Sequence, residues 1–329
     1  QALAERRMSV VGRASEPPRP PQLPWQAAVW NCRVAIAGGA SGIGAACSGA
    51  MSACVRVKRW GQALGLLAEL VREAMVPSLS ALSAAVAAYG EGHRWADGLA
   101  LLAGAAAARR QLDAPLCNAA VSTCGRSSRW QLAIALVEDM PRLVVRANAV
   151  TYAAAVSACD RGRAWAAALG LLMSARESKL LQGAVAHNAA VSACEKAARW
   201  QSALAILGLA RQSSVRLSLV SYGSAVAACG GAWRWEGVLA LVGEMEAAGL
   251  PPDTAAHNAV LHSYERAWRW KDALTQLHRL AAAQQKRQQG EALFDVVSVG
   301  HALGACERAG SRRPCAGCAW LPIDPLGEY

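Results

Sequence analysis

The sequence predicts an all-α fold: a right-handed α-α superhelix of about seven helical hairpins, each 35 residues long. Two observations support this prediction. Tryptophans recur at a constant spacing of 35 residues, and self-similarity at a period of roughly 20–50 residues is typical of solenoids. The composition agrees, because 54% of the 329 residues are hydrophobic while the chain holds one Phe and five Tyr. A sheet protein would use more aromatic and β-branched residues.

A column of equivalent tryptophans defines the repeat. It consists of Trp60, Trp95, Trp130, Trp165, Trp200, Trp235 and Trp270, and Trp25 extends it by one step toward the N-terminus. Six residues before each of the seven stand Cys54, Tyr89, Cys124, Cys159, Cys194, Cys229 and Tyr264. The residue immediately before is an arginine in six repeats, namely Arg59, Arg94, Arg129, Arg199, Arg234 and Arg269. Ala164 is the exception.

Within each repeat the apolar residues follow a helical period. In one copy the apolar positions at i, i+3, i+4 and i+7 are Trp200, Ala203, Leu204 and Leu207. They form a single stripe on the second helix, and residues 188–194 predict the first. One hairpin cannot bury its own apolar face, so neighbouring hairpins must stack. We therefore expect the tryptophan column to be largely buried, and the off-column Trp233 and Trp268 to be exposed.

The repeat also divides the chain. Residues 1–24 are predicted to be a basic, Pro-rich leader or linker, with the remnant of a transit peptide as one interpretation. Residues 25–311 form the repeat array, and residues 312–329 form an irregular tail. Seven extra residues around Gln284–Glu291 interrupt the last spacing, and Arg312 stands where the next tryptophan is expected. The final repeat is therefore half-made, or the chain is truncated.

Charge and cysteine content limit the function classes. The formal net charge is +11, which favours an anionic partner such as nucleic acid or a membrane surface. Apolar stretches are interrupted by charges before they reach 18 residues, so no transmembrane helix is predicted. A helical chain of this length with eleven Cys does not resemble a small disulfide scaffold. The cysteines of the repeat column are better interpreted as small buried hydrophobes.

One segment imitates a dinucleotide-binding fingerprint. Residues 38–44 (Gly-Gly-Ala-Ser-Gly-Ile-Gly) follow the apolar residues 34–37, as in a strand and turn that place a pyrophosphate at a helix N-terminus. Such a unit needs an acidic residue about 20 positions later, where Arg59 and Trp60 stand instead. A nucleotide-binding enzyme is therefore a distant third interpretation.

No catalytic or metal site is predicted. Cys315 and Cys318 could supply two zinc ligands, but structural zinc needs four, and no second pair or nearby His is present. The chain contains no zinc-deaminase signature and no clustered Asp set of a metal nuclease. We therefore predict a non-enzyme without cofactors.

The hairpin resembles the pentatricopeptide repeat. The family pattern has Thr-Tyr or His-Asn near the start of the first helix, an Ala-Leu pair in the second, and Pro-Asp between repeats. These features stand at Val150–Tyr152, His187-Asn188, Pro252-Asp253 and His257-Asn258. Trp at the start of each second helix and Ser-Ala-Cys in the first resemble the P-type variant of algal and dinoflagellate members. The resemblance covers roughly residues 25–310.

The resemblance implies that each repeat reads one RNA base through the residues twelve before and eighteen after its Trp. The implied pairs are Ser48/Ser78, Ser83/Asp113, Asn118/Asn148, Asn188/Ser218 and, after the insertion, Asn258/Asp295. Gly223/Asp253 is half a pair, and Ala153/Gly183 has no polar side chain. Asn carries both a donor and an acceptor for a base edge, and such arrays read single strands one base per repeat. The family's code implies G for Ser/Asp, a pyrimidine for Asn/Asn, C for Asn/Ser and U for Asn/Asp.

The resemblance further implies contacts beside the bases. Bases would be sandwiched by Val150, Val185 and Val220, and phosphates would be contacted by Arg56, Arg126, Arg161, Lys196 and Arg266. The alternative for these basic residues is an ordinary solvated helix end. The tryptophan column has an alternative too, because aromatic rings stack on bases in many single-strand binders, but core packing is favoured.

The expected function is therefore sequence-selective binding of single-stranded RNA in organellar RNA processing, stabilisation or translation. We expect a monomer without membrane contact, in the plastid or, alternatively, the mitochondrion, with a processing enzyme recruited in trans. The rival is a protein-binding helical scaffold of the tetratricopeptide type, whose period is about 34 residues.

Overall fold

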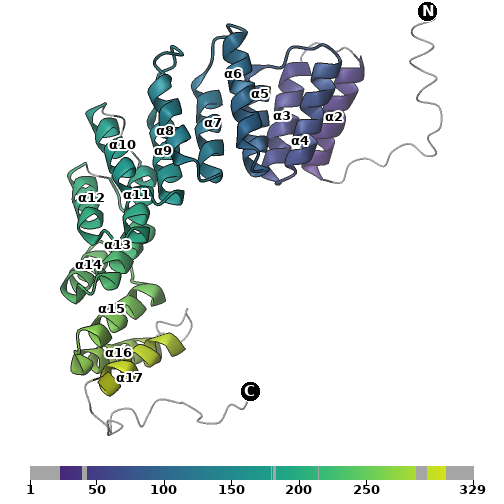
Figure 1. Ribbon diagram of the computed structural model, residues 1–329. Helices are drawn as coiled ribbons and strands as arrows, with labels where there is room; N and C mark the ends of the chain where they lie inside the picture. The colour runs from purple at the N-terminus through teal and green to yellow at the C-terminus, as the bar shows by residue number, and fades with distance from the viewer. Residues whose placement is uncertain are drawn as a thin grey trace, which may run out of the picture. The chain divides into compact units, whose positions relative to one another are not determined.

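The computed structural model describes residues 23–38, 43–178, 180, 183–213, 215–286 and 295–308. Within these ranges the chain forms sixteen helices and no strand (Figure 1). The predicted all-α repeat fold is therefore confirmed.

First and second helices of the hairpins alternate along the chain. In order they are α2 (Pro24–Gly38), α3 (Ile43–Arg56), α4 (Trp60–Arg72), α5 (Leu79–Glu91), α6 (Trp95–Ala107), α7 (Ala114–Arg126), α8 (Trp130–Asp139), α9 (Ala149–Arg161), α10 (Trp165–Glu177), α11 (Ala184–Lys196), α12 (Trp200–Gln212), α13 (Leu219–Gly231), α14 (Trp235–Ala247), α15 (Thr254–Arg266), α16 (Trp270–Lys286) and α17 (Val296–Arg308). Every even-numbered helix from α4 to α16 begins at a tryptophan of the column. The odd-numbered helices from α3 onward are the first helices.

The helices fall into two compact units. One contains α2–α7 together with residues 140–145, and the other contains α8–α17. In the first unit α5 packs against α3 and α7. In the second unit α9, α11, α13, α15 and α17 pack in succession, each against the next first helix along the chain. First helices therefore form a continuous layer within each unit.

Capping residues fix where the first helices begin. The side chains of Ser78, Asp113, Asn148, Ser218 and Asp253 each accept a hydrogen bond from the backbone N–H three residues later. This bond satisfies a donor that the helix itself leaves unpaired. At Gly183, the equivalent residue of α11, no side chain can do so. The first helices end at a turn whose third residue is left-handed, as Ala198 shows (φ 53°).

The cysteine column lies in the core. Cys54, Cys124, Cys159, Cys194, Cys229 and Cys306 are all buried. Burial raises the pKa of the Cys124, Cys159 and Cys194 thiols to about 11, so they remain protonated and unreactive at neutral pH. Their interpretation as small buried hydrophobes is confirmed. Cys32 and Cys47, outside the column, form a disulfide between α2 and α3.

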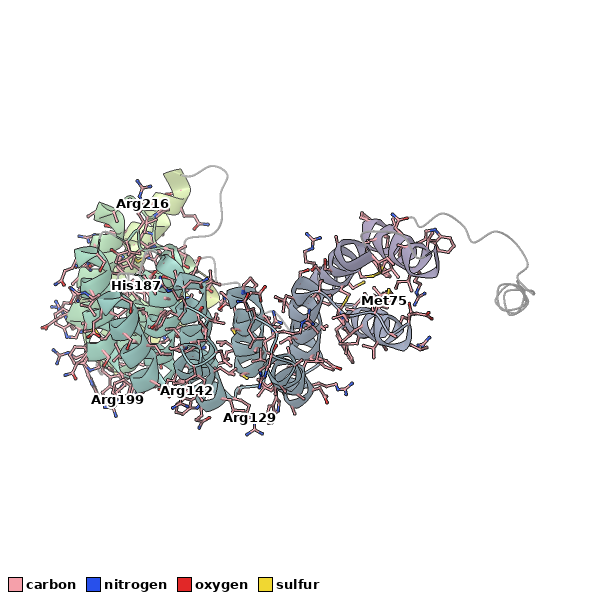
Figure 2. All side chains as sticks on the ribbon, turned by 90° about the horizontal axis from the view of Figure 1, so that it is seen from above. Met75, Arg129, Arg142, His187, Arg199 and Arg216 are labelled. Carbon is pink, nitrogen blue, oxygen red and sulfur yellow. A yellow bond between two sulfur atoms is a disulfide. The ribbon has the colours of Figure 1, made fainter. Side chains whose placement is uncertain are left out.

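The tryptophan column packs against the core, close to the expectation that it would be largely buried, but none of its rings is completely enclosed. The six rings from Trp95 to Trp270 have intermediate exposure, and Trp60 is 37% exposed. The arginine of the next repeat lies over the ring at Trp25, Trp165, Trp200 and Trp235. Arg199 lies over Trp165, with 5.0 Å from its guanidinium carbon to the ring centroid. In Figure 2 Arg199 lies at the outer edge of its unit, whereas His187 lies among the helices.

The same stacking recurs through the second unit. The guanidinium carbon of Arg234 lies 4.8 Å from the Trp200 ring centroid, and that of Arg269 lies 4.1 Å from Trp235. The next first helix also approaches the ring. At Gly162, directly after α9, an added Cβ would collide with the Trp130 ring. The Arg-Trp dipeptide is thus a contact between neighbouring repeats, which we call the Arg–Trp ladder.

The nucleotide-binding interpretation is wrong. Residues 34–37, which the fingerprint needs as a strand, belong to α2, and residues 39–42 lie outside the described residues. In the part of the chain that the structure describes, no helix is long and apolar enough to cross a bilayer. The predicted leader up to residue 22 and the tail with Arg312, Cys315 and Cys318 also lie outside it.

Candidate nucleic-acid interface

The predicted contact residues of one repeat lie on one face of its first helix. In α11 Val185, Asn188, Ser192 and Lys196 follow each other at i, i+3, i+7 and i+11, a spacing that keeps side chains on one side of an α-helix. The other faces of α11 are buried, as Ala190, Val191 and Cys194 show. At about 1.5 Å per residue, Asn188 and Lys196 are separated by roughly 12 Å along the helix axis. We call this side of the first helices the reading face.

The structure brings one predicted reading pair into contact in the second unit. Nδ2 of Asn188 donates to Oγ of Ser218 at 3.1 Å, although the two residues are 30 positions apart. Oγ of Ser221 donates to Oδ1 of the same amide. Ser221 also completes the capping box of α13 with Ser218. The amide therefore has a fixed orientation, with one N–H and one lone pair left for a ligand.

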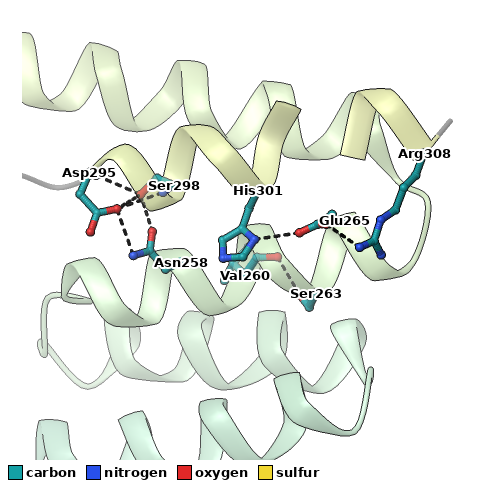
Figure 3. Close-up of polar contacts among 8 residues, drawn as sticks. All are labelled: Asn258, Val260, Ser263, Glu265, Asp295, Ser298, His301 and Arg308. Atoms are coloured by element: carbon teal, nitrogen blue, oxygen red, sulfur yellow. Dashed lines mark hydrogen bonds and ion pairs between the residues drawn. The ribbon is translucent and has the colours of Figure 1, made fainter. Parts of the chain in front are cut away.

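A second pair, Asn258/Asp295, has the same geometry (Figure 3). Nδ2 of Asn258 donates to Oδ1 of Asp295 at 3.2 Å, and Oγ of Ser298 donates to Oδ1 of Asn258. The backbone N–H of Ser298 donates to the Asp295 carboxylate at 3.0 Å. This bond, followed by that from Asn258, lowers the pKa of Asp295. Asp295 is therefore a carboxylate at neutral pH, which distinguishes this pair from the uncharged Asn188/Ser218.

Two further predicted reading residues are bonded within their own helices. Oγ of Ser48 donates to the Ala45 carbonyl at 3.0 Å, and Oγ of Ser83 donates to the Leu79 carbonyl at 2.9 Å. Asn118 is half-buried on α7. Ser78, Asp113, Asn148 and Asp253 are N-caps. Ser218 is an N-cap as well. Except at Gly183, the side chain eighteen residues after the Trp therefore caps the next first helix, whether or not it also contacts a base.

The predicted sandwiching valines are exposed. Val150, Val185 and Val220 have 61%, 63% and 64% of their surface accessible, although they belong to well-formed helices. Val297 occupies the same position on α17 and is 52% exposed. Sequence reasoning missed Val297 because the insertion after α16 shifts the spacing. The same position on four first helices therefore presents an exposed valine.

The predicted phosphate contacts form a stripe in which some charges are already paired. Nζ of Lys196 lies 2.8 Å from a carboxylate oxygen of Asp160, on the preceding first helix. A guanidinium nitrogen of Arg126 lies 3.1 Å from Glu91 in the same arrangement. Each acid neutralises a cation of the stripe, which sequence reasoning counted as free.

The other three stripe residues have no acidic partner in the described ranges. Arg56 and Arg161 are exposed, and Arg266 lies over the Trp233 ring at 4.8 Å. Their charges remain available to an anionic ligand. No group of three or more His, Cys, Asp or Glu side chains that could hold a metal occurs among the described residues.

Sequence reasoning missed a polar cluster at the end of the second unit. Glu265 is 8% exposed and accepts from Nδ1 of His301 at 2.8 Å; its other oxygen lies 3.0 Å from Arg308 (Figure 3). The Glu265–Arg308 pair is the equivalent of Asp160–Lys196 once the seven-residue insertion is counted. Correcting the register for that insertion would have revealed it.

Comparison with solved structures identifies the fold. The chain matches no protein-family model and no curated protein sequence. It superposes on the crystal structure of the pentatricopeptide repeat protein PPR10 from maize with a TM-score of 0.58 and 22% identity, over 93% of this chain and 42% of the maize chain. The chain has the pentatricopeptide repeat fold. It spans less than half the length of the maize structure.

Two other pentatricopeptide repeat structures match less closely. The repeat domain of Arabidopsis thaliana protein-only RNase P 1, in complex with tRNA, has a TM-score of 0.46 and 12% identity, over 57% of this chain and 95% of that one. Maize PPR10 in complex with an 18-nt psaJ RNA element has a TM-score of 0.31 and 16% identity, over 94% of this chain and 59% of that one.

Proposed function

We propose that this chain is a pentatricopeptide repeat protein that binds single-stranded RNA along the reading face, one nucleotide per repeat. The observation that carries the proposal is the recurrence of one constellation. Asn188/Ser218 and Asn258/Asp295 each hold an oriented amide next to the next helix's N-cap. A basic residue stands two turns beyond each amide, Lys196 after Asn188 and Arg266 after Asn258. One turn before Asn188 the exposed Val185 adds apolar surface, whereas Ala255 occupies that position before Asn258.

The constellation matches the parts of a nucleotide. An oriented amide offers a donor and an acceptor to a base edge, and the valines offer apolar surface to the base faces. The stripe offers charge to the phosphates. Maize PPR10, whose fold the chain shares, has also been crystallised with an RNA element, which supports RNA as the ligand.

The proposed selectivity is uneven along the array. Ser83/Asp113, Asn118/Asn148, Asn188/Ser218 and Asn258/Asp295 would discriminate between bases, whereas Gly183 and Gly223 leave their pairs incomplete. We further propose that the protein acts by occupying an organellar transcript, in the plastid or the mitochondrion, without catalysis of its own. A processing enzyme would then be recruited in trans.

Binding of a labelled single-stranded RNA pool, followed by fluorescence anisotropy, tests the proposal against duplex RNA of the same length. Three unpaired stripe residues, each neutralising one phosphate, give an expected log–log salt slope of about −2 for a single strand. Replacing Arg56, Arg161 and Arg266 by Ala should remove most of this slope. Equal affinity for duplex and single strand, or no binding to either, would contradict the proposal.

A further inference from the structure

Two tryptophans outside the column lie on the surface. Trp233 and Trp268 are 61% and 64% exposed. They occupy the same turn position in successive hairpins, with φ values of 61° and 59°. The other hairpins place Lys58, His93, Ser128, Arg163 and Ala198 at this position, all with positive φ. The turn therefore does not require an aromatic ring, and a bulky residue is uncommon in this conformation.

Trp233 lies next to a cation of the basic stripe. The guanidinium carbon of Arg266, from the next first helix, lies 4.8 Å from the Trp233 ring centroid. Arg266 is itself exposed and has no acidic partner in the described ranges. Ring and guanidinium together form a flat, positively charged surface. Proteins that bind single strands combine a basic track with aromatic rings on which bases stack.

The hairpin that carries Trp233 cannot read a base with its own first helix. Along the reading face of α13 stand Val220, Gly223, Ala227 and Gly231. None of them offers a hydrogen bond from its side chain or a charge for a phosphate. A nucleotide passing α13 therefore lacks the contacts that α11 offers through Asn188 and Lys196.

We propose that Trp233 and Trp268 are stacking platforms for bases of the bound single strand, and that Trp233 takes the base that α13 leaves unread. The proposal rests on the RNA binding proposed above and adds to it an affinity that does not depend on sequence, because every base has a stacking face. Arg266 attracts the phosphate of that nucleotide and holds the ring from one side. Its positive charge favours RNA over an apolar protein segment as the occupant.

The test measures binding of the full chain to labelled oligouridine by fluorescence anisotropy. Trp233→Ala and Trp268→Ala should each weaken binding by about tenfold, as expected for loss of one stacked base. Trp233→Phe should retain most of the affinity. Ala198→Trp, at the equivalent turn position, should tighten binding, and the turn accepts the ring because Trp233 and Trp268 already occupy it.

Two controls separate stacking from other roles. Trp30→Ala removes a tryptophan that is 45% exposed on α2 and should leave the affinity unchanged. With an abasic oligonucleotide the parent chain and Trp233→Ala should bind equally, because no base remains to stack.

Three results would overturn the proposal. If the parent chain and the Trp233→Ala/Trp268→Ala variant bind oligouridine equally well, the two rings do not stack on bases, although the chain does bind RNA. If Trp233→Ala weakens binding to the abasic strand as much as it weakens binding to oligouridine, the ring acts only by positioning Arg266. If the parent chain binds no RNA, the proposed function fails and the platforms fail with it.

Discussion

The guanidinium carbon of Arg234 lies 4.8 Å from the ring centroid of Trp200, the tryptophan of the preceding hairpin. Because Arg234 directly precedes Trp235, which is covered in turn by Arg269, the dipeptide links three successive repeats. In a solenoid each repeat contacts only its neighbours, so stability depends on such nearest-neighbour contacts. The 35-residue periodicity of Arg-Trp is therefore a property of the interface between repeats.

The ladder should contribute measurably to stability. Arg234→Ala is expected to lower the free energy of unfolding by about 0.5–1 kcal/mol, the usual value for a cation–π contact at an exposed site. Trp200→Ala should cost more, about 2 kcal/mol, because it also removes half-buried apolar surface. Urea unfolding followed by circular dichroism measures both.

A double-mutant cycle isolates the contact itself. Trp200→Ala combined with Arg234→Ala should cost less than the two single losses together, by about 0.5–1 kcal/mol. Strict additivity would show that the Arg234 guanidinium gains nothing from the ring.

The acids that pair with the stripe should restrain RNA binding. Asp160→Asn releases Lys196, whose Nζ lies 2.8 Å from the Asp160 carboxylate. We expect tighter binding to single-stranded RNA and a salt slope steeper by about 0.7, the contribution of one added phosphate contact. Anisotropy titrations at several salt concentrations give both quantities.

Glu244→Gln is the matched control. It breaks the ion pair between Glu244 and Arg211, two residues on second helices, and changes net charge by the same amount. If both variants steepen the slope equally, net charge rather than the position of Lys196 governs binding.

Two buried histidines should make stability depend on pH. Burial lowers the pKa of His187 and His257 below the 6.5 of an exposed imidazole. The unfolded chain therefore takes up protons at higher pH than the folded chain. Stability from these groups is complete above about pH 6.5 and is lost as the pH falls toward their folded pKa values. Melting temperatures measured from pH 7.5 to pH 5 should decrease accordingly, by about a few degrees.

The residues at the equivalent positions of neighbouring repeats suggest a variant that tests this pH dependence of stability. Tyr152 and Tyr222 occupy the position equivalent to His187 and His257, so tyrosine fits the site. The double variant His187→Tyr/His257→Tyr should lose stability less steeply on acidification, whereas His93→Tyr, at an exposed turn, should behave like the parent. A parent-like pH profile for the double variant would exclude the two histidines as the cause.

The repeat was predictable from sequence because the same packing positions recur every 35 residues. Trp and Cys occupy two of these positions and make the period easy to recognise. Three features were not. The stacking of Arg234 over Trp200 depends on how neighbouring repeats pack. The neutralisation of Lys196 depends on Asp160, a residue of the preceding first helix. The two side chains meet only because neighbouring first helices stack. The position eighteen after each Trp is ambiguous in principle, because Ser218 is both an N-cap and a predicted reading residue.

Ser221 offers a test of how the amide is oriented. Its hydroxyl donates to Oδ1 of Asn188, which fixes which edge of the amide faces a base. Ser221→Ala should reduce discrimination between bases at that nucleotide, with little change in overall affinity. Binding to four RNAs that differ only at this nucleotide measures the effect. Ser263→Ala controls for a general loss of packing, because it removes a buried hydroxyl that is bonded to its own helix. If Ser263→Ala reduces discrimination between bases as much as Ser221→Ala does, Ser221 does not orient the amide.

The reading pair itself can be exchanged for another pair of the same chain. Asn188→Ser with Ser218→Asp reproduces the combination at Ser83/Asp113. Aspartate is as good an N-cap as serine, so α13 should still begin at its present residue. We expect the preference at this one nucleotide to move from C toward G, by about 1–3 kcal/mol if contacts to bases in duplex DNA are a guide.

The preferences at the Asn258/Asp295 and Asn118/Asn148 nucleotides should stay unchanged, because separate repeats read them. Selection from a random RNA pool with both proteins measures the change. Recovery of the same motif from both would mean that Ser218 serves only as a cap, even if RNA binding itself is real.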